Sequence, residues 1–147
     1  MVATVGNDVI PDDDHVVRHC KATWFDDDGD LTSAAFKLRQ DNGEEYLSVG
    51  WPEFFAGLTQ DQQLANVRAE LSSVRTVRPT HQLAVLQVGN TRNYVRANSP
   101  DHRNLLFKHK PIPNYNSHGG IFGLEPGGDM IAELVLQIVE GVISAKP

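Results

Sequence analysis

Residues 116–120, with the sequence NSHGG, contain the side chain best suited to acid–base chemistry. The imidazole of His118 titrates near neutral pH, so it can act as a catalytic acid or base. Gly119 and Gly120 would let the backbone approach a ligand closely, and Ser117 adds a hydroxyl. Because binding residues favour loops held on a rigid scaffold, this segment indicates a ligand contact, with a purely structural loop as the alternative.

Arg18 is the second candidate for chemistry because it interrupts an otherwise apolar stretch. Strand alternation points its side chain the same way as Val16 and Cys20, which predicts a half-buried guanidinium. A buried guanidinium needs a partner and suits a carboxylate or a phosphate. Two interpretations stay open: a structural ion pair, with Glu53 for instance, or a catalytic pair in which Arg18 holds an anion near His118. The second predicts that Arg18 and His118 lie within about 10 Å of each other across a concave pocket.

Other residue types give weaker signals. His109 is a further candidate ligand contact, and His102, His109 and His118 would form one site only if the strand order brings them together. His15 and His19 have the spacing of a zinc pair on a helix, but on a strand they stand roughly 13 Å apart. The single cysteine, Cys20, excludes an internal disulfide and a cysteine-based zinc cluster. We therefore predict no metal site and no cofactor.

An aromatic cluster, Trp51, Phe54 and Phe55, lies in the sequence WPEFF. Such a cluster commonly fills the core and seats the following helix. The alternative is a surface that binds a partner protein.

Charge is segregated along the chain. The total is −6, but residues 1–30 alone have a net charge of −6, whereas residues 68–110 hold eight basic and two acidic side chains. The two regions can neutralise each other within one fold, pair with a second copy as a homo-oligomer, or present a basic face to an anion. Tyr94 and Phe107 lie among the basic residues of 68–110, which is the pattern of weak single-strand nucleic-acid binding.

The element pattern is strands, helix, strands, helix. The segments 15–25, 31–39 and 45–49 predict a meander, with a hairpin signal at Asp41, Asn42 and Gly43. Thr59 and Gln62 form a capping-box pattern before a helix that extends to Val74. Further predicted elements are strands at 83–88, 92–96 and 105–109, a loop over 114–128, and a helix from Asp129 to about Ser144.

These elements predict one α+β domain over residues 1–147, with 1–13 as a loose lead-in. We expect a largely antiparallel sheet of about five or six strands with two helices packed on one face. No apolar run reaches the roughly 18 residues of a membrane span, and the start lacks the pattern of a signal peptide, so we expect a cytoplasmic protein. The leading functional hypothesis is a small accessory or regulatory protein that binds a partner protein. The alternatives are an enzyme or binder for a phosphate-bearing small molecule that uses Arg18 and His118, and a nucleic-acid binder through residues 68–110.

Overall fold

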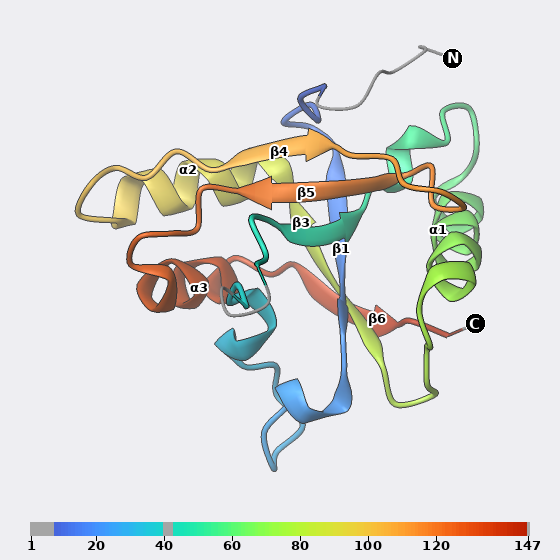
Figure 1. The fold of residues 1–147 in the computed structure, drawn as a ribbon, viewed down its shortest axis with the longest axis horizontal. Helices are drawn as coiled ribbons and strands as arrows, with labels where there is room; N and C mark the ends of the chain where they lie inside the picture. Colours follow the sequence, from blue (N-terminus) through green and yellow to red (C-terminus); the bar gives the residue numbers. More distant parts are fainter. Residues whose placement is uncertain (1–7, 40–42, 147) are drawn as a thin grey trace.

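The computed structural model describes residues 8–39 and 43–146, and a six-stranded antiparallel sheet crosses the molecule (Figure 1). The α+β class with a largely antiparallel sheet is confirmed. From edge to edge the strands are β4 (Leu106–His109), β5 (His118–Phe122), β2 (Leu47–Gly50), β1 (His15–Cys20), β3 (Gln82–Gln87) and β6 (Gly141–Ser144).

The sheet opens in its middle, between β1 and β2. Strands β1 and β3 are paired over their full length, from His15↔Gln87 to Cys20↔Gln82. Between β1 and β2, in contrast, the register of the described residues has the single pair Val17↔Gly50. In Figure 1, β4, β5 and β2 run across the view while β1, β3 and β6 run steeply down it. Past Val17 the two strands therefore diverge and leave backbone groups and space between them.

Helices cover both faces of the sheet. They are α1 (Gln60–Val74), α2 (Val88–Asn98) and α3 (Gly128–Gln137). Helix α1 packs through Val67 against Val17 and Leu83. Helices α2 and α3 belong to the cluster that contains Val16 and Ala84, which point to the other face. The two helices predicted from the sequence thus lie on opposite faces rather than on one.

The start of α1 matches its sequence pattern. The Thr59 hydroxyl accepts a hydrogen bond from the Gln62 amide at 3.2 Å, and the Gln62 side chain accepts one from the Thr59 amide at 3.0 Å. This capping box satisfies two amides that the first turn of the helix would otherwise leave free. The predicted helix is confirmed, and it places Leu71 and the following Arg75 beside the opening in the sheet.

The predicted strand at 31–39 is wrong, and with it the meander. The chain instead forms two short 3₁₀ helices, η1 (Ala22–Trp24) and η2 (Ser33–Phe36). Ser33, Ala35 and Phe36 are buried in η2, which packs against α3. Asp41 and Asn42 of the hairpin signal lie outside the described residues, and Gly43 has a φ of 74°.

The predicted strand at 92–96 is also wrong, because this segment forms α2. The Gln87 side chain accepts a hydrogen bond from the Asn90 amide at 3.2 Å and so caps the helix. Val88, Thr91 and Val95 are buried and follow helical rather than strand spacing. Packing of this face against the sheet therefore overrides the β propensity of residues 92–96.

Two strands, β5 and β6, form in segments where we expected a loop and the end of a helix. Strand β5 lies inside the predicted loop 114–128 and pairs with both β2 and β4. The last helix ends at Gln137 rather than near Ser144, and the chain then returns as β6 on the edge of β3. The Glu140 amide donates to the Val85 carbonyl at 2.9 Å, so sheet pairing replaces the last predicted turns of the helix.

The inner part of the predicted loose lead-in is ordered. Ile10 is fully buried, and its amide donates to the Phe107 carbonyl at 2.8 Å. Val9 forms a bridge with Lys108. Residues 8–10 therefore extend the sheet beside β4.

Candidate functional site

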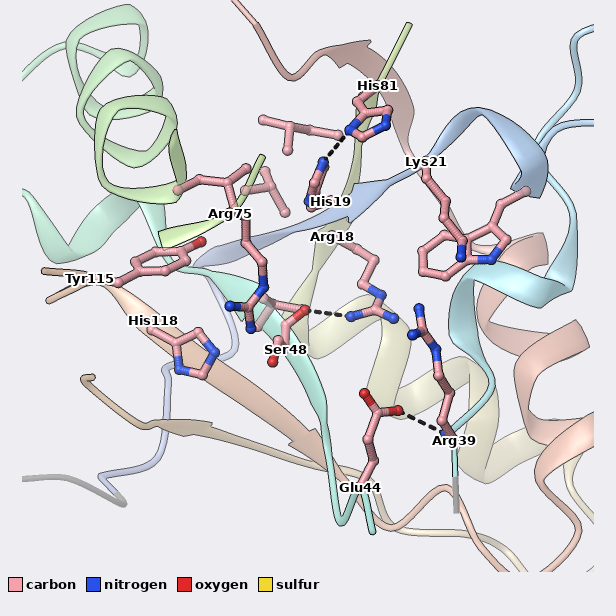
Figure 2. Close-up of a pocket in the computed structure, with 15 residues that line it drawn as sticks. Arg18, His19, Lys21, Arg39, Glu44, Ser48, Arg75, His81, Tyr115 and His118 are labelled. Carbon is pink, nitrogen blue, oxygen red and sulfur yellow. Dashed lines mark hydrogen bonds between the residues drawn. The ribbon is translucent and has the colours of Figure 1, made fainter. Parts of the chain in front are cut away.

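A pocket of about 330 Å³ lies where β1 and β2 diverge (Figure 2). We call it the basic pocket. Its polar and aromatic lining comes from β1, the 21–44 segment, β2, the end of α1, the start of β3 and the β5 region. These residues are Arg18, His19, Lys21, Trp24, Arg39, Glu44, Ser48, Arg75, His81, Tyr115 and His118.

Positive charge dominates this lining. Arg18, Lys21, Arg39 and Arg75 face one carboxylate, Glu44. The carboxylate of Glu44 accepts a hydrogen bond from the backbone amide of Arg39 at 2.7 Å. Within residues 8–39 and 43–146, none of the four cations is part of a salt bridge. A concave wall with this excess of positive charge attracts anions.

Arg18 forms the floor of the pocket and is 8% exposed. Its Nε donates to the Ala35 carbonyl and its Nη1 to the Ser48 carbonyl, each at 2.9 Å. Both acceptors are neutral, and they hold the guanidinium rigidly across the gap between the diverging strands. Burial lowers the pKa of Arg18; Cys20 and Glu44 oppose this effect, and the nearby Arg39 and Arg75 add to it. The guanidinium nevertheless stays charged at neutral pH, so a nearly buried cation faces the pocket with no hydrogen bond to a carboxylate of the described residues.

The ion pair expected between Arg18 and Glu53 does not form. Glu53 instead binds His15, accepting from the backbone amide at 2.9 Å and lying 2.6 Å from Nδ1. Both residues line a separate pocket near α1. The predicted ion pair with Glu53 is therefore wrong, and among the described residues Arg18 bonds to backbone carbonyls instead.

Three of the cations form cation–π contacts with the Trp24 ring. The Arg18 Cζ lies 5.2 Å from the centre of the indole ring, the Lys21 Nζ 5.3 Å and the Arg39 Cζ 5.8 Å. Contacts of this kind orient cations over an aromatic ring without neutralising them. The 3₁₀ turn η1 thus supplies the side wall of the basic pocket.

His118 lines the opposite wall and is 2% exposed. Its Nδ1 lies 2.6 Å from the Lys110 carbonyl, which can only accept, so Nδ1 carries the proton. Its Nε2 then holds a lone pair, and this buried atom has no hydrogen-bond partner among the described residues. Burial lowers the pKa of His118, and Arg75 adds to the effect, although the bond to Lys110 opposes it. The ring is therefore neutral near pH 7.

Two hydroxyl groups complete this wall. Burial raises the pKa of Tyr115, so its phenol remains protonated and can donate a hydrogen bond. The Tyr115 hydroxyl lies 2.6 Å from where a Cβ on Gly50 would be, so only glycine fits there. Ser48 lies in β2 opposite Gly120 and lines the pocket as well. These groups can donate to an anion that the arginines attract.

A histidine pair marks another part of the wall. His19 Nε2 and His81 Nδ1 are 2.8 Å apart, and the Arg78 amide also points to His81 Nδ1 at 3.3 Å. His81 Nδ1 therefore accepts, and His19 donates. Burial, together with the neighbouring His81 and Arg18, lowers the pKa of His19 to about 4.

The structure brings Arg18 and His118 to the same pocket, although the sequence separates them by a hundred positions. The remaining predicted ligand contacts do not line it. Ser117 is buried, and its hydroxyl donates to Glu70 at 2.7 Å. Gly119 and Gly120 lie in β5, where a Cβ on Gly120 would come 2.4 Å from the Tyr46 ring. These glycines permit close packing, so the prediction of a glycine-rich ligand loop is wrong.

His109 also lies away from the basic pocket. It pairs with Gly119 across β4 and β5, so its side chain points to the face opposite that of His118. There it packs against Trp51 and Phe54, and its Nε2 lies 2.7 Å from the Asn116 carbonyl. His102 is exposed beyond α2. The three histidines therefore do not converge.

The aromatic cluster belongs mainly to the core. Trp51 is 8% exposed, and its indole nitrogen donates to Asp14 at 2.9 Å. Phe54, in the short helix η4 (Pro52–Phe54), and Phe55 are half-buried and stack edge to face. The core-filling interpretation describes Trp51, which offers little surface to a partner.

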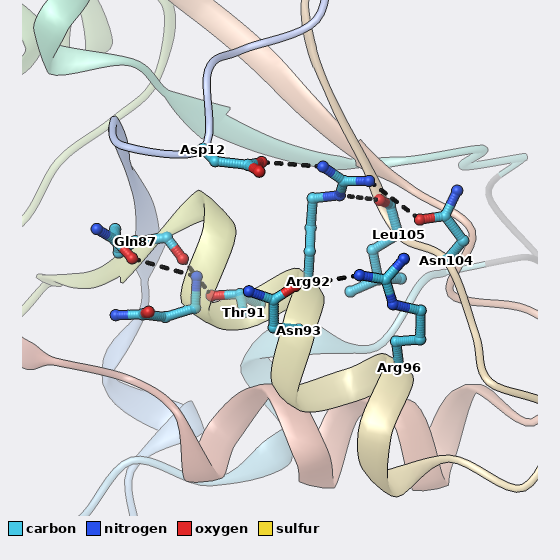
Figure 3. A network of polar contacts seen from close by, with 9 residues as sticks. Asp12, Gln87, Thr91, Arg92, Asn93, Arg96, Asn104 and Leu105 are labelled. Atoms are coloured by element: carbon cyan, nitrogen blue, oxygen red, sulfur yellow. Dashed lines mark hydrogen bonds and ion pairs between the residues drawn. The ribbon is translucent and has the colours of Figure 1, made fainter.

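The basic segment 68–110 is spread over several elements. Arg75 reaches the basic pocket, whereas Arg92 binds Asp12 at 2.9 Å, the Leu105 carbonyl and the Asn104 side chain (Figure 3). Arg103 pairs with Asp101 at 2.8 Å. Part of this charge is thus neutralised within the fold.

Sequence reasoning missed Lys21, Trp24, Arg39, Arg75 and Tyr115. They come from separate segments, and none of these segments has a recognisable motif. The charge asymmetry of residues 68–110 pointed only to Arg75. The other four residues have no local signal, because the divergence of β1 and β2 is what brings them together.

In the described part of the chain, no cluster of three or more His, Cys, Asp or Glu side chains could hold a metal ion. None of the described helices combines the length and apolarity that a membrane span requires.

Comparisons with known proteins add no assignment. No family model, curated protein or solved structure matches this chain.

Proposed function

We propose that this protein binds a phosphate-bearing small molecule in the basic pocket. The observation that carries the proposal is Arg18, a nearly buried guanidinium held by two neutral carbonyls and, among the described residues, bonded to no carboxylate. Keeping such a charge out of water without a carboxylate bonded to it is unfavourable, and a bound anion removes the penalty. A phosphate suits the geometry because a guanidinium donates to it through two nitrogens.

The remaining lining supports a multiply charged anion. Arg39 and Arg75 are exposed and add two further guanidinium groups to the lining beside Arg18. Four cations against the single carboxylate Glu44 favour a phosphate dianion over a monocarboxylate. The volume of about 330 Å³ lies at the small end of the range for metabolite sites.

The alternative of an accessory protein that acts through a protein partner has less support. Trp51, on which it partly rests, is buried. The large apolar side chains that are exposed lie on separate segments: Val9, Leu58, Met130 and Val142.

Calorimetric titration with pyrophosphate and glycerol 3-phosphate tests the proposal. We expect binding by the wild type, and a thermal shift of about 5–10 °C when the ligand is present at a hundred times its Kd. Arg18→Gln should weaken binding at least tenfold, because one charge-assisted contact is lost. Arg96→Gln removes the same charge from the exposed face of α2 and should leave binding unchanged.

Circular dichroism and the Tm of each variant without ligand establish that it is folded. Equal loss of binding in Arg18→Gln and Arg96→Gln would mean that only the net charge of the protein matters. Absence of binding by the wild type at low salt would refute the proposal.

A further inference from the structure

The wall of the basic pocket contains a buried acceptor to which no described residue donates. The Glu44 carboxylate also accepts, but the Arg39 amide already donates to it. Arg18, Arg39, Arg75 and Lys21 can only donate, and the Tyr115 hydroxyl is protonated. His118 differs because its Nδ1 proton is committed to the Lys110 carbonyl, which leaves a lone pair on Nε2. Nε2 is buried, and within the described residues nothing donates to it. In Figure 2 the ring lies below the Arg75 guanidinium, with its second nitrogen directed toward the interior of the pocket.

A buried acceptor of this kind calls for a donor on the ligand. The oxygens of a phosphate monoester dianion cannot supply it, since their lone pairs would face the lone pair of Nε2. An ammonium group could donate, but it would add positive charge beside Arg18 and Arg75, which is unfavourable. A neutral hydroxyl satisfies both conditions.

We infer that the ligand is a phosphate monoester carrying a free hydroxyl group, and that His118 accepts the hydrogen bond of that hydroxyl through Nε2. The inference rests on the proposed function and specifies the class of ligand. The arginines bind the phosphate, while His118 accepts a hydrogen bond from the alcohol part of the same molecule.

The size of the pocket agrees with a small polyol phosphate. The volume of about 330 Å³ lies at the small end of the range for metabolite sites. Glycerol 3-phosphate, with about ten non-hydrogen atoms, is small enough to enter it.

The test compares two ligands that differ in their hydroxyl groups, glycerol 3-phosphate and propyl phosphate. Both offer the same phosphate to Arg18, but propyl phosphate leaves His118 Nε2 without a donor. By calorimetry, we expect the wild type to bind glycerol 3-phosphate about tenfold or more tightly than propyl phosphate. This comparison needs no variant, so it does not depend on how a substitution folds.

Variants then assign the preference to a residue. His118→Phe keeps a ring of similar size and removes the acceptor, so it should bind propyl phosphate as the wild type does and lose the preference. Ser48→Ala is the comparison variant: it removes a phosphate donor from the same pocket, so it should weaken the binding of both ligands alike and retain the preference.

Each other outcome contradicts the inference in a recognisable way. Equal binding of both ligands by the wild type would overturn the inference and leave the proposed function standing. A preference that survives in His118→Phe but disappears in Ser48→Ala would assign the hydroxyl to Ser48 and overturn it as well. Failure of both ligands and of pyrophosphate to bind would refute the proposed function and the inference together.

Discussion

The buried titratable residues of this protein differ in charge. Arg18 is charged and 8% exposed, while His118 is neutral and 2% exposed. Burial also raises the pKa of Cys20 to about 11, so the lone thiol is protonated and unreactive near neutral pH. Neutral groups cost less free energy to bury than the charge of Arg18 does. This contrast is why the proposed function rests on Arg18.

The low pKa of His19 makes stability depend on pH. The unfolded chain binds a proton at His19 below about pH 6.5, whereas the folded protein does so only near pH 4. Between these values the unfolded state holds more protons, so this contribution to stability is complete above pH 6.5 and is lost as the pH falls toward 4. His19 is partly exposed, so we expect a loss on the order of 1 kcal/mol.

Urea unfolding at pH 7.5, 5.5 and 4.5 measures this effect. His19→Gln keeps a donor toward His81 and cannot titrate, so its stability should fall less between pH 7.5 and 4.5 than that of the wild type. Some dependence should remain, because burial lowers the pKa of His81 and of His118 as well. An unchanged slope in His19→Gln would contradict the assignment.

At the scale of elements, Gly50 is the point where the sheet divides. It pairs with Val17 of β1 and with His118 of β5, so three strands meet there. A Cβ at this position would come 2.6 Å from the Tyr115 hydroxyl and 2.7 Å from a Val67 methyl. The missing side chain lets α1 and Tyr115 approach the sheet beside the basic pocket.

We expect Gly50→Ala to reduce the free energy of unfolding by about 1–3 kcal/mol, because both neighbours are buried and must move. Gly141→Ala is the control, since nothing lies within 4 Å of its Cβ position in β6. It should change stability by no more than about 0.5 kcal/mol. Urea unfolding of the two variants makes the comparison, and similar losses would show that the close approach at Gly50 is unimportant.

At the scale of the whole molecule, opposite charges far apart in the sequence join the N-terminal segment to the rest. Arg92 of α2 binds Asp12, the Leu105 carbonyl and the Asn104 side chain at once (Figure 3). Residues 8–10 continue beside β4. Arg92 therefore connects α2 both to the N-terminal segment and to the residues that precede β4. Self-neutralisation, one of the outcomes expected from the charge pattern, operates here.

Arg92→Gln should destabilise the protein by about 1–3 kcal/mol, because it leaves the partly buried Leu105 carbonyl without its donor and removes the ion pair with Asp12. Arg96→Gln, one turn further along α2, loses only a contact to Asn93 and should be within about 0.5 kcal/mol of the wild type. Thermal unfolding of both variants measures the difference. Equal stabilities would mean that water replaces Arg92 at no cost.

The sequence by itself determined the features that depend on neighbouring residues. The capping box at Thr59 and Gln62, the apolar run that forms β3, and the α+β class all follow from local spacing. It also singled out Arg18 and His118 as unusual residues. Each of these signals lies within one segment of the chain, where spacing and residue type suffice.

The tertiary structure alone decided the rest. Residues 92–96 become helical because α2 packs on the sheet, and in β5 the missing side chain of Gly120 leaves room for the Tyr46 ring. The basic pocket exists because β1 and β2 diverge after one pair, which lets η1, α1 and β5 contribute to a single wall. These outcomes depend on contacts between residues distant in the chain, and no local pattern specifies which distant segments will meet.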